Sequence, residues 1–249
     1  MKKPVFKNIF KFTLAAGLFS GILFTAAVPT AGNKTKIVSL AENKLGARMA
    51  LFSQLKLDSL GLSKDAYAYA LAGLEKLEKE GKLANPDLLT IADFSLPSSK
   101  KRLFVIDLKK GEVLFNTLVS HGRNSGTAVA TNFSNTPESF KSSLGFYVTG
   151  QTYKGEHGYS LRLAGEEQGI NDNAMSRGIV MHSAKYVSEQ IAKLQGYIGR
   201  SLGCPAIPEQ VHRQIIEAIK DGTCLFLYSP DKSYMANSKM LMPTDTTIV

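Results

Sequence analysis

The spacing of apolar residues changes near residue 100, and this change limits the architectures that the chain can adopt. Over residues 41–81 apolar side chains recur every three or four positions, which is the spacing of a buried helix face. From Leu103 onward, short apolar runs alternate with glycine-containing turns, which is typical of β-strands. The pattern predicts a mainly β domain with flanking helices.

Two helices are expected in the first of these regions. Leu45 and Phe52 belong to the apolar face of the first helix. Ser63 is a good N-cap for the second helix, and Gly81 can end it in the left-handed conformation. The second helix is expected to bury Tyr67, Ala70, Leu71, Leu74 and Leu77. Both helices are predicted to pack against the main domain.

The remaining elements are predicted from apolar runs and turn residues. Residues 85–99 are polar and contain prolines, so they are expected to form a connector. Pro208 is expected in the first turn of one late helix, and the tail after Pro230 is expected to be polar and loosely held. The predicted strands cover residues 103–108, 113–120, 144–149, 178–182 and 223–228.

The first 31 residues have the pattern of a secretory signal peptide. Four lysines precede a charge-free apolar run over residues 12–28, and small residues follow, with cleavage expected after Ala27 or Ala31. The alternative is a retained anchor, although the run is shorter than the roughly 20 residues of a spanning helix. We therefore expect an exported protein without a membrane span, in the periplasm or cell envelope. The predicted segments are a signal peptide (1–31), a helical segment with connector (32–100), a mainly β domain (101–230) and a polar tail (231–249).

The charge of the chain is mildly basic once this segment is removed. The full chain has 30 lysines and arginines against 21 acidic residues, a net charge of +9; without the four N-terminal lysines, 26 remain against 21, a net charge of +5. This suits an anionic cell wall and equally an ordinary solvated surface. Because basic residues do not alternate with aromatic residues in a stripe, nucleic acid is not an expected partner. Nothing in the sequence indicates an oligomeric state.

The two cysteines have different surroundings. Cys224 lies in an apolar run, where it resembles a small buried hydrophobe. Cys204 lies between Gly203 and Pro205, so the backbone turns there. One interpretation is a disulfide between them, as exported proteins often have. The other is that Cys204 is a nucleophile with His182, at a strand end, as its base; contact between them would lower the pKa of the thiol.

Two strings of residues resemble a known family. Residues 181–184 read M-H-S-A and residues 199–206 read G-R-S-L-G-C-P-A. They resemble the histidine and S-x-G-C elements of the L,D-transpeptidase catalytic domain, of the YkuD type. Residues 93–95 (D-F-S), 121–124 (H-G-R-N), 133–135 (F-S-N) and 158–161 (G-Y-S-L) resemble, in the same order, a divergent branch of murein L,D-transpeptidase proteins. The resemblance implies a β-sandwich catalytic domain preceded by a short helical segment.

The resemblance also implies a mechanism and its residues. Cys204 would attack a carbonyl of a peptidoglycan stem peptide, a D-amino acid would leave, and the thioester would pass to an amine acceptor. His182 would move the proton, and Ser183 would orient its ring. The backbone N–H groups of the Gly203–Cys204 turn would hold the oxyanion. Ser201 would hold the loop. No cofactor and no metal are implied.

The chain departs from many family members at two positions. Leu202 stands where many have a second histidine, and Ala206 where many have an arginine that helps to place the substrate. The role of this missing arginine is assigned first to Arg200, which is close to Cys204 in the sequence, and then to Arg177 and Arg123. Each of the three can bind a carboxylate through two hydrogen bonds. Surface ion pairing is the alternative for all three.

Other polar residues are candidates for the substrate cleft. His121 lies where a strand enters a loop, and Tyr159 and His157 lie in a glycine-rich stretch that would suit a lid. Ordinary loop polarity explains each of them equally well. A zinc peptidase that uses His121, His157 and His182 is disfavoured, because no metal-ligand spacing such as H-E-x-x-H occurs.

Three functions follow from these patterns. The first is a peptidoglycan L,D-transpeptidase that cross-links stems or exchanges a D-amino acid. The second is an L,D-carboxypeptidase, in which water resolves the same thioester. The third, from a different class, is a non-catalytic wall-binding module with a Cys204–Cys224 disulfide.

Overall fold

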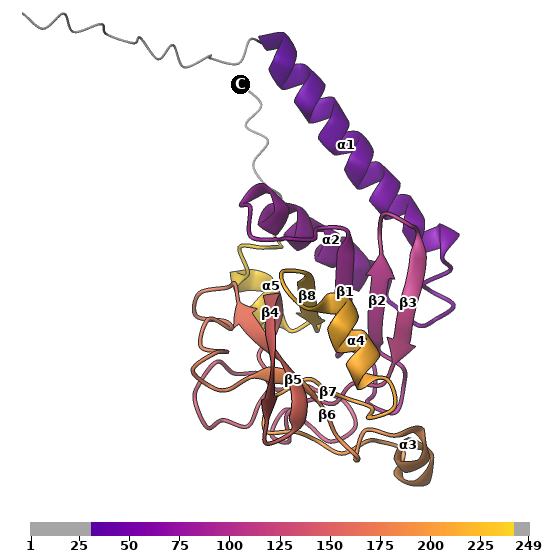
Figure 1. Cartoon of the computed structure of the whole chain (residues 1–249), viewed down its shortest axis with the longest axis vertical. Coiled ribbons are helices and arrows are strands. Elements are labelled where there is room, and N and C mark those ends of the chain that lie inside the picture. Colours follow the sequence, from indigo (N-terminus) through magenta and orange to yellow (C-terminus); the bar gives the residue numbers. More distant parts are fainter. Residues whose placement is uncertain (1–30, 242–249) are drawn as a thin grey trace, which may run out of the picture. The chain divides into compact units, whose positions relative to one another are not determined.

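The computed structural model describes the backbone of residues 31–241 and the side chains from residue 43 (Figure 1). The expected signal peptide therefore lies outside the described residues, apart from the backbone of Ala31. The described residues from 41 onward form one compact unit. Within the described residues, no helix has the length and apolar character needed to span a membrane.

Two helices precede the sheet, as the apolar spacing predicts. They are α1 (Ala31–Gln54) and α2 (Lys64–Lys79). Ser63 Oγ accepts a hydrogen bond from the N–H of Ala66 at 3.0 Å, which confirms the predicted N-cap. Gly81 has φ +68°, and the next N–H, that of Lys82, reaches the Leu77 carbonyl at 3.0 Å. The helix therefore ends where the glycine predicts.

The apolar stripe of α2 packs closely on the sheet. All five residues of the predicted stripe are fully buried. A Cβ at Gly73 would lie 2.1 Å from the ring of Phe146, so only glycine lets the helix approach this closely. The Phe146 ring in turn stacks on Phe226, with 4.1 Å between centroids. These contacts place the centre of the core between α2 and the middle strands.

Eight strands form one sheet with the order β3-β2-β1-β8-β4-β5-β6-β7 (Figure 1). Neighbours are antiparallel except for the parallel pairs β1–β8 and β6–β7. The prediction of a mainly β domain with flanking helices is confirmed. The strands are β1 (Leu88–Asp93), β2 (Leu103–Asp107), β3 (Glu112–Thr117), β4 (Gly145–Gly155), β5 (Gly158–Gly165), β6 (Val180–Ser183), β7 (Ala206–Ile207) and β8 (Cys224–Tyr228).

The expected connector over residues 85–99 is wrong in its middle, because residues 88–93 form β1. This strand is buried along its whole length and lies between β2 and β8. A central strand covered on both faces has no alternation of apolar and polar residues. Because the strand has no such alternation, the prolines and polar residues around it led to the prediction of a connector.

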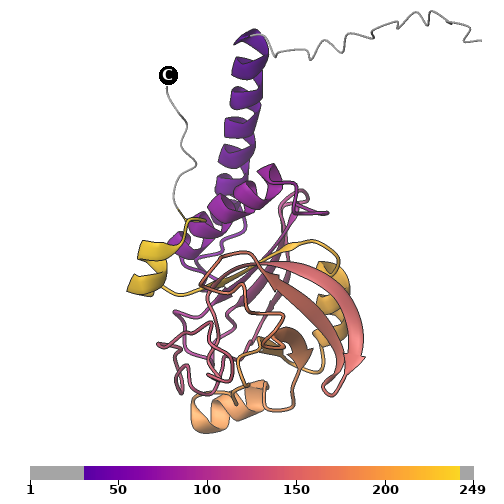
Figure 2. The same cartoon turned by 90° about the vertical axis from the view of Figure 1, so that its left-hand side faces the viewer.

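The strands β4 and β5 form a long, bent hairpin, which Figure 2 shows most clearly. Their register shifts between Thr149 and Thr152, as at a β-bulge, which bends a strand. The hairpin ends with Gly155 paired to Gly158, so Glu156 and His157 form its tip. β5 was not predicted from the sequence.

Three helices follow β6. They are α3 (Glu189–Gln195), α4 (His212–Ile219) and α5 (Lys232–Asn237). α4 is the predicted late helix, but it begins four residues after Pro208 and has no side-chain cap. Its buried residues are Ile215, Ile216 and Ile219.

The tail after Pro230 is not loosely held over its described part, which corrects the prediction. Tyr234 of α5 is buried, and so is Ser238. Buried Glu167 accepts hydrogen bonds from the Phe146 N–H at 2.9 Å, from the Tyr234 hydroxyl at 3.0 Å and from the Ser238 hydroxyl. One distant carboxylate thus anchors residues 234–238. Residues 242–249 lie outside the described part.

Candidate active site

His182 lies near the end of β6, as predicted, and its ring is held by the backbone. Nδ1 is 2.9 Å from the carbonyl oxygen of Ser183. A carbonyl only accepts, so Nδ1 carries the proton and Nε2 is left with a lone pair. It is therefore the backbone of Ser183 that orients the ring, and Nε2 can take up a proton.

The turn that carries Cys204 is closed by Ser201. The Ser201 hydroxyl donates to the Cys204 carbonyl at 2.6 Å and accepts from the Gly203 N–H at 3.1 Å. The backbone of Ser201 also bonds to the segment at His121 and Arg123. Ser201 thus holds the loop that the sequence assigned to it.

Gly203 is required by the shape of this turn. Its φ is +129°, and an added Cβ would lie 2.9 Å from Ile179 and 3.0 Å from the carbonyl oxygen of Lys141. Its N–H is engaged by Ser201, however, and so does not present the free oxyanion donor that we expected from Gly203. The reason is that the serine side chain folds back inside the turn.

The thiol of Cys204 lies beside β6 rather than against the imidazole. Sγ accepts from the Val180 N–H at 3.4 Å and donates to the Gly178 carbonyl at 3.6 Å. Val180 is two residues before His182 on the strand. Burial raises the pKa of the Cys204 thiol, while the Val180 N–H and the charge of Arg177 oppose that shift. The hydrogen bonds of Sγ therefore go to the backbone of Gly178 and Val180, and the expected contact with the imidazole, which would lower the thiol pKa, is not formed here.

A second imidazole covers His182. The ring of His157, at the tip of the β4–β5 hairpin, stacks on it with 4.3 Å between centroids and 21° between planes. His182 is only 3% exposed, whereas His157 is exposed. Burial lowers the pKa of His182 and the charge of His157 acts in the same direction, while the bond to Ser183 opposes them.

The charge of Arg177, rather than that of Arg200, acts on the pKa of the Cys204 thiol. The Arg177 guanidinium donates to the carbonyls of Ser134 at 2.8 Å and Lys141 at 2.7 Å, and an added Cβ at Gly203 would lie 3.5 Å from it. Arg200 instead donates to the carbonyls of Arg123 and Gly126, both at 3.1 Å. Arg177 is therefore the arginine whose charge acts on the Cys204 thiol, whereas the assignment of Arg200 to substrate placement stays a prediction.

Arg123 and Tyr159 face other partners. The Arg123 guanidinium lies over the ring of Phe140 at 4.2 Å. The Tyr159 hydroxyl donates to Glu217 of α4, and Arg213 of the same helix lies over the Tyr159 ring at 4.9 Å. Tyr159 therefore ties the hairpin to α4, a role that the sequence did not reveal.

His121 is not available to a substrate, contrary to the prediction. It is fully buried, and Arg102 donates to its Nδ1 at 2.8 Å. Nε2 therefore carries the proton and donates to the Gly126 carbonyl at 3.1 Å. Burial and the charge of Arg102 lower the pKa of His121 to about 4. Both ring nitrogens are used within the fold.

Both cysteines are free. Cys224 is fully buried in β8, where burial raises the pKa of its thiol well above the usual range. It pairs with Leu89 of β1 and Val148 of β4. The alternative with a Cys204–Cys224 disulfide is therefore not what the structure contains.

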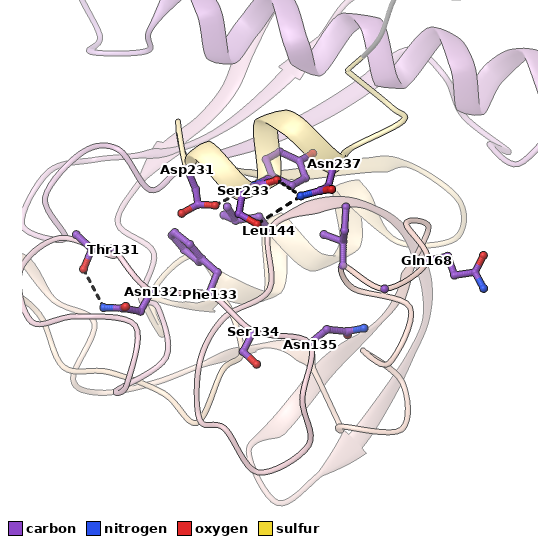
Figure 3. Close-up of a pocket in the computed structure, with 13 residues that line it drawn as sticks. Thr131, Asn132, Phe133, Ser134, Asn135, Leu144, Gln168, Asp231, Ser233 and Asn237 are labelled. Atoms are coloured by element: carbon purple, nitrogen blue, oxygen red, sulfur yellow. Dashed lines mark hydrogen bonds between the residues drawn. The ribbon is translucent and has the colours of Figure 1, made fainter.

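A polar cavity of about 590 Å³ is lined in part by the segment that contains Ser134, whose carbonyl accepts a hydrogen bond from Arg177 (Figure 3). Its walls come from residues 131–135, Leu144, residues 168–170, Asp231 and α5, and they include neither Cys204 nor His182. Ser134 is in its wall, so Arg177 links this cavity to the cysteine turn through the Ser134 carbonyl. Asp231 is the charged residue among the lining side chains.

These observations define a class: a mainly β domain that places a cysteine, on a turn closed by a serine, next to a strand that carries a histidine near its end. Within that class, the sequence profile of the L,D-transpeptidase catalytic domain matches residues 58–228, and the chain belongs to this family. No curated protein matches the chain.

Several solved structures resemble the chain weakly. An L,D-transpeptidase from Mycobacterium smegmatis is 15% identical with a TM-score of 0.37, covering 57% of this chain and 59% of that one. The cell shape determining protein Pgp2 (K307A mutant) from Campylobacter jejuni is 15% identical with a TM-score of 0.38, covering 64% and 54%. An L,D-transpeptidase from Stackebrandtia nassauensis is 14% identical with a TM-score of 0.35, covering 77% and 93%. The family assignment rests on the sequence profile alone.

Two contributors to the site were not identified from the sequence. The Val180 N–H that binds Sγ is a backbone group, so it has no signature in the residue type. The position of His157 over His182 did have a partial signal. Gly155 and Gly158 enclose a two-residue turn, which is typical of a hairpin tip.

Proposed function

We propose that this protein is a peptidoglycan L,D-transpeptidase that uses Cys204 as nucleophile and His182 as general base. The observation that carries the proposal is the hydrogen bond from His182 Nδ1 to the Ser183 carbonyl at 2.9 Å. It leaves Nε2 unprotonated on the strand beside the Cys204 turn. Family membership supports an enzyme that acts on peptidoglycan.

The first half of the reaction forms a thioester. His182 Nε2 takes the thiol proton as Sγ attacks the carbonyl carbon at the L-centre of diaminopimelate. The tetrahedral intermediate collapses, the C–N bond to the terminal D-alanine breaks, and His182 returns the proton to the leaving amine. The enzyme is left acylated on Sγ with a neutral imidazole.

The second half transfers the acyl group. The amine of a neighbouring stem attacks the thioester carbonyl, His182 accepts the amine proton, and the thiolate leaves and regains that proton. Water in place of the amine would give the carboxypeptidase reaction. Transfer to an amine is the reaction we propose, because it is the one that gives the L,D-transpeptidase family its name.

Substrate binding must bring thiol and imidazole into line. Hydrogen bonds between catalytic groups are often long or misaligned without substrate and tighten in the complex. Here Sγ is engaged by Gly178 and Val180 until a substrate displaces those bonds. Arg177, whose charge opposes the rise in the pKa of the Cys204 thiol, is proposed to stabilise the developing thiolate.

The test is an assay by mass spectrometry on disaccharide-tetrapeptide. Wild type should release D-alanine and form a cross-linked dimer, whereas Cys204→Ala should do neither and should still fold, because the change removes only Sγ and leaves the bonds of Ser201 that close the turn. Cys224→Ala, at the other free cysteine, is the matched control and should remain active.

The remaining outcomes decide between the alternatives. Release of D-alanine without dimer would favour the carboxypeptidase. Activity that persists in Cys204→Ala would contradict the nucleophile. We also propose that residues 1–31 direct export to the periplasm or cell envelope; fractionation of cells that express the full chain, with and without these residues, tests this.

A further inference from the structure

We propose that His157 is a positioning residue for His182: its ring covers the catalytic imidazole and keeps it neutral and correctly turned until substrate binds. The proposal rests on the proposed function of His182 as general base. It assigns a role to the tip of the β4–β5 hairpin that the sequence indicated only as a glycine-rich loop.

The geometry is that of a stacked pair. The two rings are 4.3 Å apart at their centroids and 21° from parallel, so His157 shields one face of His182 from water. The exposure of the two rings agrees with this arrangement: His182, the covered ring, is 3% exposed, whereas His157, the covering ring, is exposed. One edge of the covered ring is fixed by the Ser183 carbonyl. The stack and this bond together leave the ring little freedom to rotate.

Covering the ring has a consequence for its charge. A buried imidazole is easier to keep neutral than to protonate, because burial removes the water that solvates the cation. Burial lowers the pKa of His182, and any positive charge on His157 acts in the same direction. A base must be neutral to accept the thiol proton, so the cover keeps His182 ready at lower pH.

Other charged groups around the pair are engaged elsewhere. On α4, which packs against β5 and β6, Glu217 is bound to the Tyr159 hydroxyl and Arg213 lies over the Tyr159 ring. Cys204, on the turn beside β6, is bonded to Gly178 and Val180. Lys154 and Glu156 flank His157 in the hairpin and are exposed. His157 is the group whose charge acts on the pKa of His182.

The experiment is a titration of the histidine side chains by NMR in the full protein. With four histidines in the chain, each signal can be assigned from single variants. The variants are His157→Ala, which removes cover and charge, and His157→Phe, which keeps an aromatic cover. His212→Ala is the matched control, because His212 is a half-buried histidine on α4 whose Nδ1 bonds to the Glu209 carbonyl at 2.8 Å. Unfolding by urea checks that all variants fold.

We expect the midpoint of the His182 titration to rise in His157→Ala, to rise less in His157→Phe and to stay unchanged in His212→Ala. In the D-alanine release assay the acid limb should move to higher pH in the same order, with about a tenfold loss of rate at acidic pH for each unit of movement. The rate on the alkaline plateau should change less than the rate on the acid limb.

Two results would overturn the proposal. One is a His182 midpoint in His157→Ala equal to that of wild type. The other is a His157→Phe midpoint at or above that of His157→Ala, which would remove the role of the cover. Absence of D-alanine release from wild type at every pH would instead refute the proposed function, and the NMR arm would still decide whether His157 controls His182.

Discussion

The chain contains two buried histidines in two different settings. His121 lies in a network with Arg102, and His182 lies on β6 near the turn that carries Cys204. His121 is fully buried, and both of its ring nitrogens are bonded, to Arg102 and to the Gly126 carbonyl. His182 is almost as buried, but only Nδ1 is bonded to the backbone, at Ser183. Burial is the largest cause that lowers the pKa in each case.

The comparison shows that a lowered pKa does not identify a functional residue. Structural networks shift pKa values as strongly as active sites do. What separates the two histidines is the number of ring nitrogens that the fold already uses. His121 holds two segments together, whereas His182 keeps one nitrogen available beside a thiol. The two residues should therefore respond in opposite ways to the same substitution.

The largest expected effect is the contrast between His182→Gln and His121→Gln. Loss of the general base should lower the rate of D-alanine release by roughly 10²–10⁴ with little change in stability. His121→Gln should retain activity and destabilise the fold by about 1–3 kcal/mol, because Arg102 and the Gly126 carbonyl lose buried partners. Initial rates and urea unfolding curves measure the two effects. A loss of activity in His121→Gln with an unchanged unfolding curve would contradict the structural role assigned to His121.

The second prediction concerns Arg102, the cation behind His121. It is fully buried and donates to the carbonyls of Leu96 at 2.7 Å and Val119 at 2.9 Å. Its guanidinium also lies over the Phe94 ring at 4.8 Å. Arg102→Met fills much of the same volume but leaves these acceptors unpaired.

We expect Arg102→Met to lower the free energy of unfolding by roughly 3–5 kcal/mol, as when one partner of a buried charged network is removed. The control is Lys101→Met at the adjacent residue, whose exposed ion pair with Glu189 (3.1 Å) should contribute less than about 1 kcal/mol. Chemical denaturation of both variants gives the comparison. Equal losses of unfolding free energy in the two variants would mean that the hydrogen bonds of Arg102 contribute no more to stability than a surface ion pair does.

Much of the fold could be predicted from the spacing of apolar residues. α2 was predicted with its cap, its buried stripe and its terminal glycine, because a helix on the surface of a core is amphipathic. β1 could not be predicted, since a strand buried on both faces lacks alternation, and α5 could not because its anchor, Glu167, is far away in the sequence. Such long-range contacts have no local signature.

The residues of the candidate site were proposed from the sequence, but their contacts were not. The strings around His182 and Cys204 indicated which side chains to consider. They did not indicate that Ser201 would occupy the Gly203 N–H, or that Arg177 rather than Arg200 would act on the thiol. Distance along the chain is a poor measure of distance in space where a loop folds back on a strand.

The smallest effect in this comparison is a dependence of stability on pH that His121 should carry. An exposed histidine in the unfolded chain takes up a proton near its ordinary pKa of about 6.5. In the folded protein, burial and the charge of Arg102 lower the pKa of His121 to about 4. The unfolded chain therefore binds the proton first as pH falls. The stabilisation is complete above about pH 6.5 and is lost progressively down to about pH 4, an effect of up to about 3 kcal/mol.

The measurement is the free energy of unfolding in urea between pH 7 and pH 4.5, for wild type and for His121→Gln. Buried Asp93 and Glu167 have raised pKa values, so they favour the folded state as pH falls and oppose the effect of His121. Both carboxyls are present in both proteins, so the difference between the two curves isolates the histidine. The stability gap between wild type and variant should narrow toward pH 4.5. A gap that stays constant over this range would mean that His121 accepts a proton within the fold, and that its two nitrogens are less firmly engaged than those contacts indicate.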